Sequence, residues 1–221
     1  MFLGSSLSDL FRPILLIFSP SSSIIQDIES SSKSGLAHVA YFFFDFKDER
    51  KQYSHALLSS LIVQLSHLSD PFFDILFHYY STHQSGSKQP GDLTLLQCLE
   101  DMLRLPGAVP IYLILDALDE CPSTTGLPPP RERVLELVKR LIKLNLPNLR
   151  LCVTSRPEID IRTSLEPLTS NQISLHNQVG QKMDIADYVR SVVYSDSNMR
   201  RWRNEDKELV VETLSERADG M

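Results

Sequence analysis

Five hydrophobic residues in a row precede a dense acidic stretch in the middle of the chain. They belong to the segment Ile111–Asp116, which is followed closely by Asp119 and Glu120. A short uninterrupted run of this kind is typical of a strand buried on both faces, and such strands occur mainly in parallel sheets covered by helices. The segment therefore predicts an α/β fold with acidic residues at the carboxyl end of a central strand.

Similar patterns occur along most of the chain. Four further short segments are rich in aliphatic or aromatic residues and predict strands: 14–18, 39–46, 149–154 and 172–175. Segments with apolar residues at intervals of three and four predict helices: 24–28, 53–68, 72–80, 95–103 and 131–144. Strands that alternate with helices favour a parallel sheet with right-handed crossovers and helices on both faces.

Beyond residue 179 the pattern is helical only. Apolar residues recur with helical spacing over 185–193 and again over 205–218. We therefore expect two parts, an α/β nucleotide-binding-type domain over residues 1–178 and the truncated beginning of a helical subdomain over 179–221.

Composition narrows the classes of function. The 22 basic and 28 acidic residues give a net charge of −6, which disfavours binding to nucleic acid through bulk charge. No stretch approaches the length of apolar sequence that spans a membrane. Three cysteines far apart in the chain favour a reducing compartment over a disulfide framework or a cysteine zinc site: Cys98, Cys121 and Cys152. We expect an intracellular protein, located in the cytoplasm.

The acidic residues fall where open parallel sheets bind ligands, outside the carboxyl ends of strands. An aspartate at the position of Asp116 can hold Mg²⁺ beside a phosphate, because Mg²⁺ prefers oxygen ligands and retains water. A carboxylate three or four residues further on, Asp119 or Glu120, can orient an attacking water. Arg156, after the next strand, can contact a γ-phosphate through paired hydrogen bonds. The alternative is a solvated turn and a surface arginine.

Four motifs together resemble a known family. LILDALDECP at 113–122 is similar to the Walker B segment of NACHT-domain P-loop NTPases, and VTSRPE at 153–158 is similar to the end of their sensor-1 strand. FFFDF at 42–46, followed by LLSSLIVQL at 57–65, resembles the second strand and next helix of fungal NACHT proteins, also described as nephrocystin-like N-terminal domains. The resemblance covers about residues 24–221 and implies a P-loop NTPase-like fold of the STAND class.

The resemblance implies roles for individual residues. Asp116 would take the Mg²⁺-associated role, Asp119 and Glu120 the catalytic, water-orienting role, and Arg156 the sensor role on the nucleotide. The implied cofactors are ATP or GTP with Mg²⁺. Family members are signal-transduction ATPases whose nucleotide switches an oligomerising module, often with repeats further along the chain. The implied partners are therefore proteins and further copies of the chain, with neither nucleic acid nor a membrane span.

The sequence departs from the family at the phosphate loop. That loop needs a glycine-rich turn after the first strand and then Gly-Lys-Ser/Thr at the start of a helix, where N–H groups and the lysine hold the phosphates. Residues 18–25 read FSPSSSII, and no lysine in the chain directly follows a glycine. Lys33 and Ser34 come after the helix expected at 24–28, so they do not fit this position.

The missing loop has an energetic consequence. Loss of the lysine and of one or two aligned N–H groups would weaken nucleotide binding by roughly 3–6 kcal/mol, about a hundred- to ten-thousand-fold. Hydrolysis would suffer as well, because the lysine also offsets charge in the transition state. We expect a NACHT-like signalling module with impaired nucleotide binding and hydrolysis. Two alternatives remain open: a non-catalytic interaction or oligomerisation scaffold, and a fragment of a complete NACHT ATPase.

Overall fold

A computed structural model describes residues 14–17, 32, 34–82, 89–107, 109–124, 126–173 and 179–217. The chain divides into two compact units, Met1–Ile173 and Ser174–Met221. The first unit is an α/β structure and the second is a helical hairpin.

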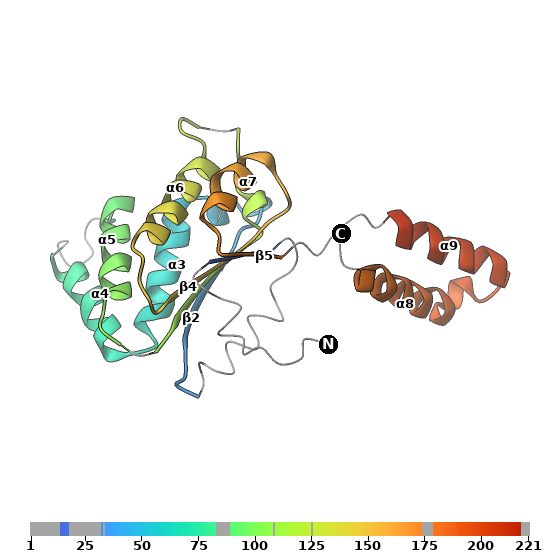
Figure 1. The fold of residues 1–221 in the computed structure, drawn as a ribbon, viewed down its shortest axis with the longest axis horizontal. Helices are drawn as coiled ribbons and strands as arrows, with labels where there is room; N and C mark the ends of the chain where they lie inside the picture. The colour runs from blue at the N-terminus through green and yellow to red at the C-terminus, as the bar shows by residue number, and fades with distance from the viewer. Residues whose placement is uncertain are drawn as a thin grey trace. The chain divides into compact units, whose positions relative to one another are not determined.

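The first unit is built on a parallel sheet (Figure 1). Its five described strands are β1 Ile14–Ile17, β2 His38–Phe43, β3 Ile111–Asp116, β4 Leu149–Thr154 and β5 Asn171–Ile173. They lie in the order β2-β3-β4-β1-β5, and every pair is parallel. Phe43 lies opposite Asp116, and Leu115 lies opposite Val153. The register therefore brings the carboxyl ends of β2, β3 and β4 to one edge of the sheet.

Helices connect these strands. The longer ones are α3 Ser54–Ser66, α4 Asp70–Thr82, α5 Asp92–Leu103, α6 Pro130–Lys143 and α7 Ile159–Leu165. Short 3-10 turns are η1 Glu49–Lys51, η3 Leu118–Glu120 and η4 Glu166–Leu168. The connections from β2 to β3, from β3 to β4 and from β4 to β5 advance in one direction across the sheet, so right-handed crossovers place their helices on one face. Figure 1 shows this arrangement.

The connection between β1 and β2 runs the other way across the sheet. The helix expected at 24–28 lies outside the described residues. Side chains on both faces of β3 are nevertheless buried throughout 111–115, as the uninterrupted hydrophobic run predicts.

The core fills the space between the sheet and the helices. Its largest fully buried side chains come mainly from α3 and α5, where apolar residues recur at helical spacing: Leu57, Leu58, Leu61, Ile62, Leu65, Leu99, Met102 and Leu103. Leu113 of β3 meets them from the sheet. The amphipathic pattern read from the sequence thus marks the faces that pack on the sheet.

Two segments differ from the sequence prediction. Strand β2 ends at Phe43 instead of residue 46, because Gln52 Nε2 donates to the carbonyls of Asp45 (3.2 Å) and Phe46 (2.7 Å) and holds a loop there. Strand β2 also lies at one end of the described sheet, and its residue Phe43 is 39% exposed. The strand is therefore not buried along its whole length. Helix α7 was not expected, since its seven residues include only two buried side chains.

The second unit consists of α8 Val179–Ser195 and α9 Asn204–Arg217, with the short turn η6 Ser197–Met199 between them. The guanidinium of Arg190 donates to Glu208 (3.2 Å), and the hydroxyl of Tyr194 donates to the same carboxylate (3.0 Å). The ammonium of Lys207 lies 4.8 Å from the centre of the Tyr194 ring. These contacts join the two helices to each other.

No helix in the described ranges is both long and apolar enough to cross a membrane.

Candidate functional site

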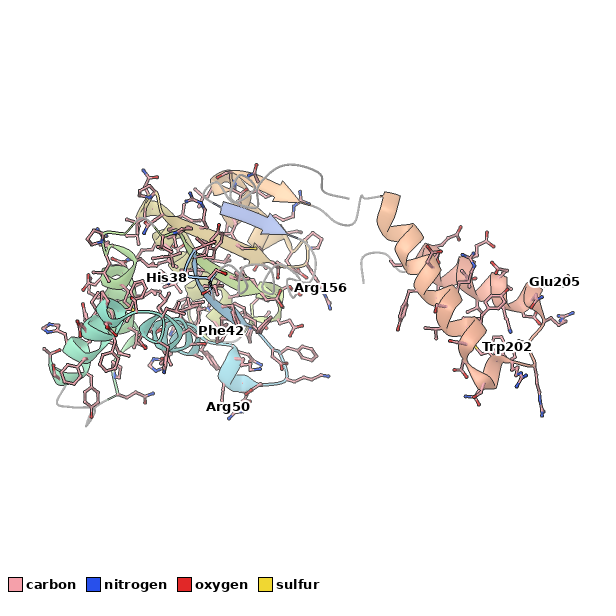
Figure 2. All side chains as sticks on the ribbon, turned by 90° about the horizontal axis from the view of Figure 1, so that it is seen from below. His38, Phe42, Arg50, Arg156, Trp202 and Glu205 are labelled. Carbon is pink, nitrogen blue, oxygen red and sulfur yellow. The ribbon has the colours of Figure 1, made fainter. Side chains whose placement is uncertain are left out.

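The carboxyl edge of the sheet gathers the four residues singled out from the sequence. Asp116 ends β3, Asp119 and Glu120 lie in η3 directly after it, and Arg156 follows β4 by two residues. Figure 2 shows where Arg156 lies on the first unit. The strand order reverses beside β1, whose connection runs to β2 while β4 connects onward to β5. Ligands of open α/β sheets bind at such a reversal, so the fold supplies a binding position at this edge.

A left-handed residue turns the chain at the end of β3. Ala117 has φ 55° and ψ 48°, a conformation that costs an L-residue about 1–2 kcal/mol. Its carbonyl accepts the amide of Glu120 at 2.9 Å, which closes the 3-10 turn η3. The turn fixes the direction in which Asp119 and Glu120 leave the strand.

The carboxylate of Asp116 is held by the neighbouring strand. The hydroxyl of Thr154, at the end of β4, donates to Asp116 Oδ1 at 2.5 Å and accepts the amide of Ala117 at 3.0 Å. Thr154 is buried, whereas Asp116 is only partly buried. The structure therefore orients the partly buried carboxylate of Asp116 at the carboxyl edge of the sheet.

This geometry suits a magnesium ion held mainly by water and phosphate. In the parts of the chain that the structure describes, no three His, Cys, Asp or Glu side chains form a metal-binding group. Mg²⁺ commonly binds through one or two carboxylates, substrate phosphates and retained water. Asp116 fits the carboxylate in such a set, and the other ligands would come from the nucleotide and solvent.

Asp119 and Arg156 contact each other. Asp119 Oδ1 accepts the backbone amide of Arg156 at 3.0 Å, and Oδ2 lies 3.4 Å from Arg156 Nε. The Asp119 side chain is only 10% exposed, but that of Arg156 is 78% exposed. The carboxylate thus ties η3 to the segment after β4, a structural role that the sequence did not indicate. Its catalytic role stays a prediction.

Glu120 points to a different segment. Its Oε2 accepts the backbone amide of Phe46 at 3.1 Å. Next to it, the Cys121 thiol donates to the carbonyl of Gln52 at 3.1 Å. The acidic turn is therefore tied to the loop after β2, and the water-orienting role of Glu120 also stays a prediction.

Arg131 is a residue of this region that sequence reasoning missed. From the first turn of α6, its guanidinium donates to the carbonyls of Cys121 (2.8 Å) and Asp119 (2.5 Å) and to the carboxylate of Asp160 in α7 (3.3 Å). Its side chain is only 10% exposed. The sequence did carry one signal for this role. Arg131 is a cation in the first turn of a helix, where the helix dipole favours acidic residues, so it needs a partner elsewhere.

The cysteines of this region are not nucleophiles. Burial raises the pKa of the Cys121 thiol to about 12, and burial together with the charge of Asp116 raises the pKa of Cys152 to about 12. Because the thiolate is the reactive form, both side chains are inert near neutral pH.

The phosphate-loop position itself follows β1. Residues 18–31 and Lys33 lie outside the described residues, and with them the serines that follow the first strand in the sequence. The described half of the site is the one contributed by β2, β3 and β4.

The parallel sheet, its strand order and the acidic turn at its carboxyl edge define an α/β module of the P-loop NTPase type. A sequence model of the family described as "Nephrocystin 3, N-terminal" matches residues 20–156, more than half of the chain. The chain therefore belongs to this NACHT-like family, which confirms the resemblance carried by its motifs.

One curated relative is the vegetative incompatibility protein HET-E-1 of Podospora anserina. The two are 30% identical over 151 residues, which cover 66% of this chain and 10% of the relative. The chain thus spans about a tenth of the length of that fungal protein.

Among solved structures, Drosophila ORC bound to DNA matches 96% of this chain and 47% of that chain, with a TM-score of 0.50 and 14% identity. At that identity the likeness shows the fold alone, and it confirms the P-loop NTPase-like α/β class. The Aeropyrum pernix ORC1 protein in complex with DNA matches 94% of this chain and 56% of that chain, with a TM-score of 0.49 and 14% identity.

Proposed function

We propose that the chain is a signalling module in which a P-loop NTPase-like fold binds nucleotide weakly and hydrolyses it poorly or not at all. One observation carries the proposal: Asp116 and Thr154 keep an oriented carboxylate at the binding edge, in a chain where no lysine follows a glycine. The protein thus retains a candidate magnesium side of the site and lacks the sequence that holds the phosphates.

Bound nucleotide would engage a small set of side chains. Asp116 would hold Mg²⁺ through water, with Thr154 fixing its orientation. Arg156 would leave Asp119 and contact the terminal phosphate. The Arg156 side chain is 78% exposed, so it has room to make this movement. Mg²⁺ would supply charge neutralisation beside the phosphates.

The signalling role is supported by the relative. HET-E-1 is named for vegetative incompatibility, and a signalling module of this class would act through protein partners and self-association. The net charge of −6 argues against nucleic acid as the partner, although the ORC proteins of similar fold are described as bound to DNA. A cytoplasmic location is part of the same proposal.

A non-catalytic scaffold is the second candidate. Its supporting observation is that the carboxylates of Asp119 and Glu120 are both engaged inside the protein, with Arg156 and with the amide of Phe46. Groups satisfied in this way stabilise a fold without needing a ligand.

Calorimetric titration of the full chain with ATP and ADP, each with Mg²⁺, separates the two candidates. The proposal predicts Mg²⁺-dependent dissociation constants of roughly 0.1–10 mM, a micromolar site weakened a hundred- to ten-thousand-fold. Asp116→Ala should abolish this binding, whereas Asp74→Ala, the same change on exposed α4, should preserve it. Micromolar binding with turnover would overturn the impairment, and no binding by a folded chain at 10 mM would favour the scaffold.

The fragment alternative has its own test. Transcript reads across residues 18–23 that contain an in-frame Gly-Lys-Ser insertion would favour a complete ATPase, whereas clean reads of the present sequence would rule this alternative out.

A further inference from the structure

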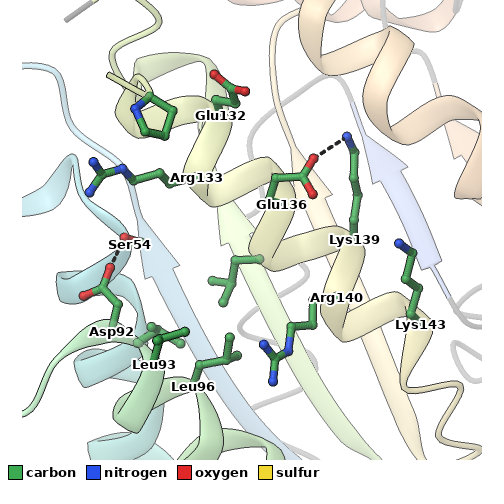
Figure 3. A pocket seen from close by; sticks show the side chains of 13 residues that line it. Ser54, Asp92, Leu93, Leu96, Glu132, Arg133, Glu136, Lys139, Arg140 and Lys143 are labelled. Atoms are coloured by element: carbon green, nitrogen blue, oxygen red, sulfur yellow. Dashed lines mark hydrogen bonds and ion pairs between the residues drawn. The ribbon is translucent and has the colours of Figure 1, made fainter. Parts of the chain in front are cut away.

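A groove separate from the sheet edge lies between α5 and α6, above α3. Its volume is about 640 Å³, within the usual range of binding sites (Figure 3). Leu58 of α3, Leu96 of α5 and Leu137 of α6 line its bottom, and all three are buried. The groove therefore has an aliphatic floor between two helical walls.

Internal contacts hold both ends of the groove in place. At one end Arg140 of α6 bridges to the buried Glu100 of α5, with Nε 2.5 Å from the carboxylate. At the other end Asp92 accepts the hydroxyl of Ser54 at 2.5 Å and pairs with His55 at 3.0 Å. Arg140 thus joins the two walls at one end, and Asp92 ties the α5 wall to α3 at the other, so the shape of the groove is preformed.

Charge is unevenly distributed along the α6 wall. Glu132 lies in the first turn of this helix, whereas Lys139 and Lys143 lie toward its end. Lys139 pairs with Glu136 at 2.8 Å. Within the described ranges Lys143 forms no salt bridge, and Figure 3 shows its side chain beside that of Lys139. Arg133 lies beside Glu132 in the first turn, so the excess positive charge of this wall lies in its last turn, at Lys143.

The rims of the groove expose aliphatic surface. Leu93, in the first turn of α5, is 79% exposed, and Leu127, next to the lining residue Pro128, is 96% exposed. Exposed leucines in the lining of an aliphatic groove and directly beside it mark a place where a partner can bury apolar area.

We propose that this groove binds an amphipathic helix of a partner protein, running antiparallel to α6 with carboxylates in its first turn. The wall from Arg133 to Lys143 has eleven residues and is about 15 Å long at a rise of 1.5 Å per residue, so about three turns of helix fill it. In the antiparallel direction the acidic first turn of the occupant meets Lys139 and Lys143, and its aliphatic stripe lies on the floor. The groove needs no nucleotide, so this partner site is additional to the sheet edge.

Two 14-residue peptides of identical composition test the proposal on the full chain. Both carry leucines at i, i+3, i+7 and i+10; one has glutamates in its first turn and lysines in its last, and the other has these charges exchanged. Fluorescence anisotropy should show at least tenfold tighter binding of the peptide with the acidic first turn. Equal affinities, or no binding of either peptide at millimolar protein, would overturn the proposal.

Variants at exposed positions locate the site. Lys143→Glu should remove most of the preference between the peptides, and Leu93→Asp should weaken both by tenfold or more. Lys51→Glu, the same charge change at an exposed position of η1, is the matched control and should leave both affinities unchanged. An effect of Lys51→Glu equal to that of Lys143→Glu would reveal nonspecific charge attraction and would also overturn the proposal.

Discussion

The hydroxyl of Thr154 lies 2.5 Å from Oδ1 of Asp116 and joins the ends of two neighbouring strands. The same oxygen accepts the amide of Ala117 at 3.0 Å, so one side chain serves both the carboxylate and the turn that follows it. The orientation of Asp116 thus depends on a residue 38 positions further along the chain.

Thr154→Val should destabilise the protein by about 1–3 kcal/mol, because it keeps the shape of the buried side chain but removes the partner of the Ala117 amide. Thr154→Ser, which keeps the hydroxyl, is the control and should cost less. Urea denaturation followed by circular dichroism measures both. Equal stability of the valine and serine variants would show that the hydroxyl contributes nothing.

Arg131→Met should destabilise the protein by about 3–5 kcal/mol. The change leaves the carbonyls of Asp119 and Cys121 without their donor, at about 1–3 kcal/mol for each unsatisfied group, whereas Asp160 is 47% exposed and is solvated when it loses its partner. Arg133→Met, the same substitution at an exposed position two residues away, should change the free energy of unfolding by less than about 0.5 kcal/mol. Similar costs for the two variants in urea denaturation would contradict the role assigned to Arg131.

Ala117→Gly should stabilise the protein by about 0.5–1 kcal/mol, since glycine adopts the left-handed conformation of this position without strain. Ala40→Gly supplies the opposite case, because Ala40 lies fully buried in β2, where glycine weakens a strand. Thermal melting of the two variants should shift the midpoint in opposite directions. A lower melting temperature for Ala117→Gly than for the parent chain would show that the backbone of Ala117 is not strained.

Alkaline pH should weaken the fold through its cysteines. Burial raises the pKa of Cys98, Cys121 and Cys152 from 9.0 to about 12. Below pH 9 the thiols are protonated in both states and cost nothing. Between pH 9 and 12 only the unfolded chain loses their protons, so stability falls by up to about 1.4 kcal/mol per pH unit for each thiol.

Two measurements check this expectation. The slope of the free energy of unfolding between pH 9 and 11 should be shallower for Cys152→Ala than for the parent chain. At pH 8 a disulfide reagent should modify the native thiols far more slowly than the thiols of the urea-unfolded chain. Rapid stoichiometric labelling of the native protein would show that the thiols are not buried.

The sequence was most informative where burial sets the pattern. Strands β3 and β4 have the predicted limits, because their hydrophobic runs are bounded by polar residues and prolines. The topology of a parallel sheet then brings Asp116 and Arg156 to one edge without further information.

The contacts that side chains make within that edge could not be predicted from the sequence in the same way. Glu120 contacts an amide 74 residues away, and Asp119 contacts Arg156 instead of facing outward. From the sequence alone, several cations and backbone amides could have paired with these two carboxylates. The packing of the loops determines which of them do. The early end of β2 has the same origin, since it depends on how Gln52 folds back on the carbonyls before it.

The position of Arg131 also sets an order of assembly. Its guanidinium joins the carbonyls after β3 to Asp160 of α7, so the contact cannot close until the chain has been synthesised past residue 160. During synthesis, β2 and β3 can pair well before this point, but the acidic turn gains its final support only when α7 has left the ribosome. The edge that carries the candidate site is therefore among the last parts of the α/β unit to form.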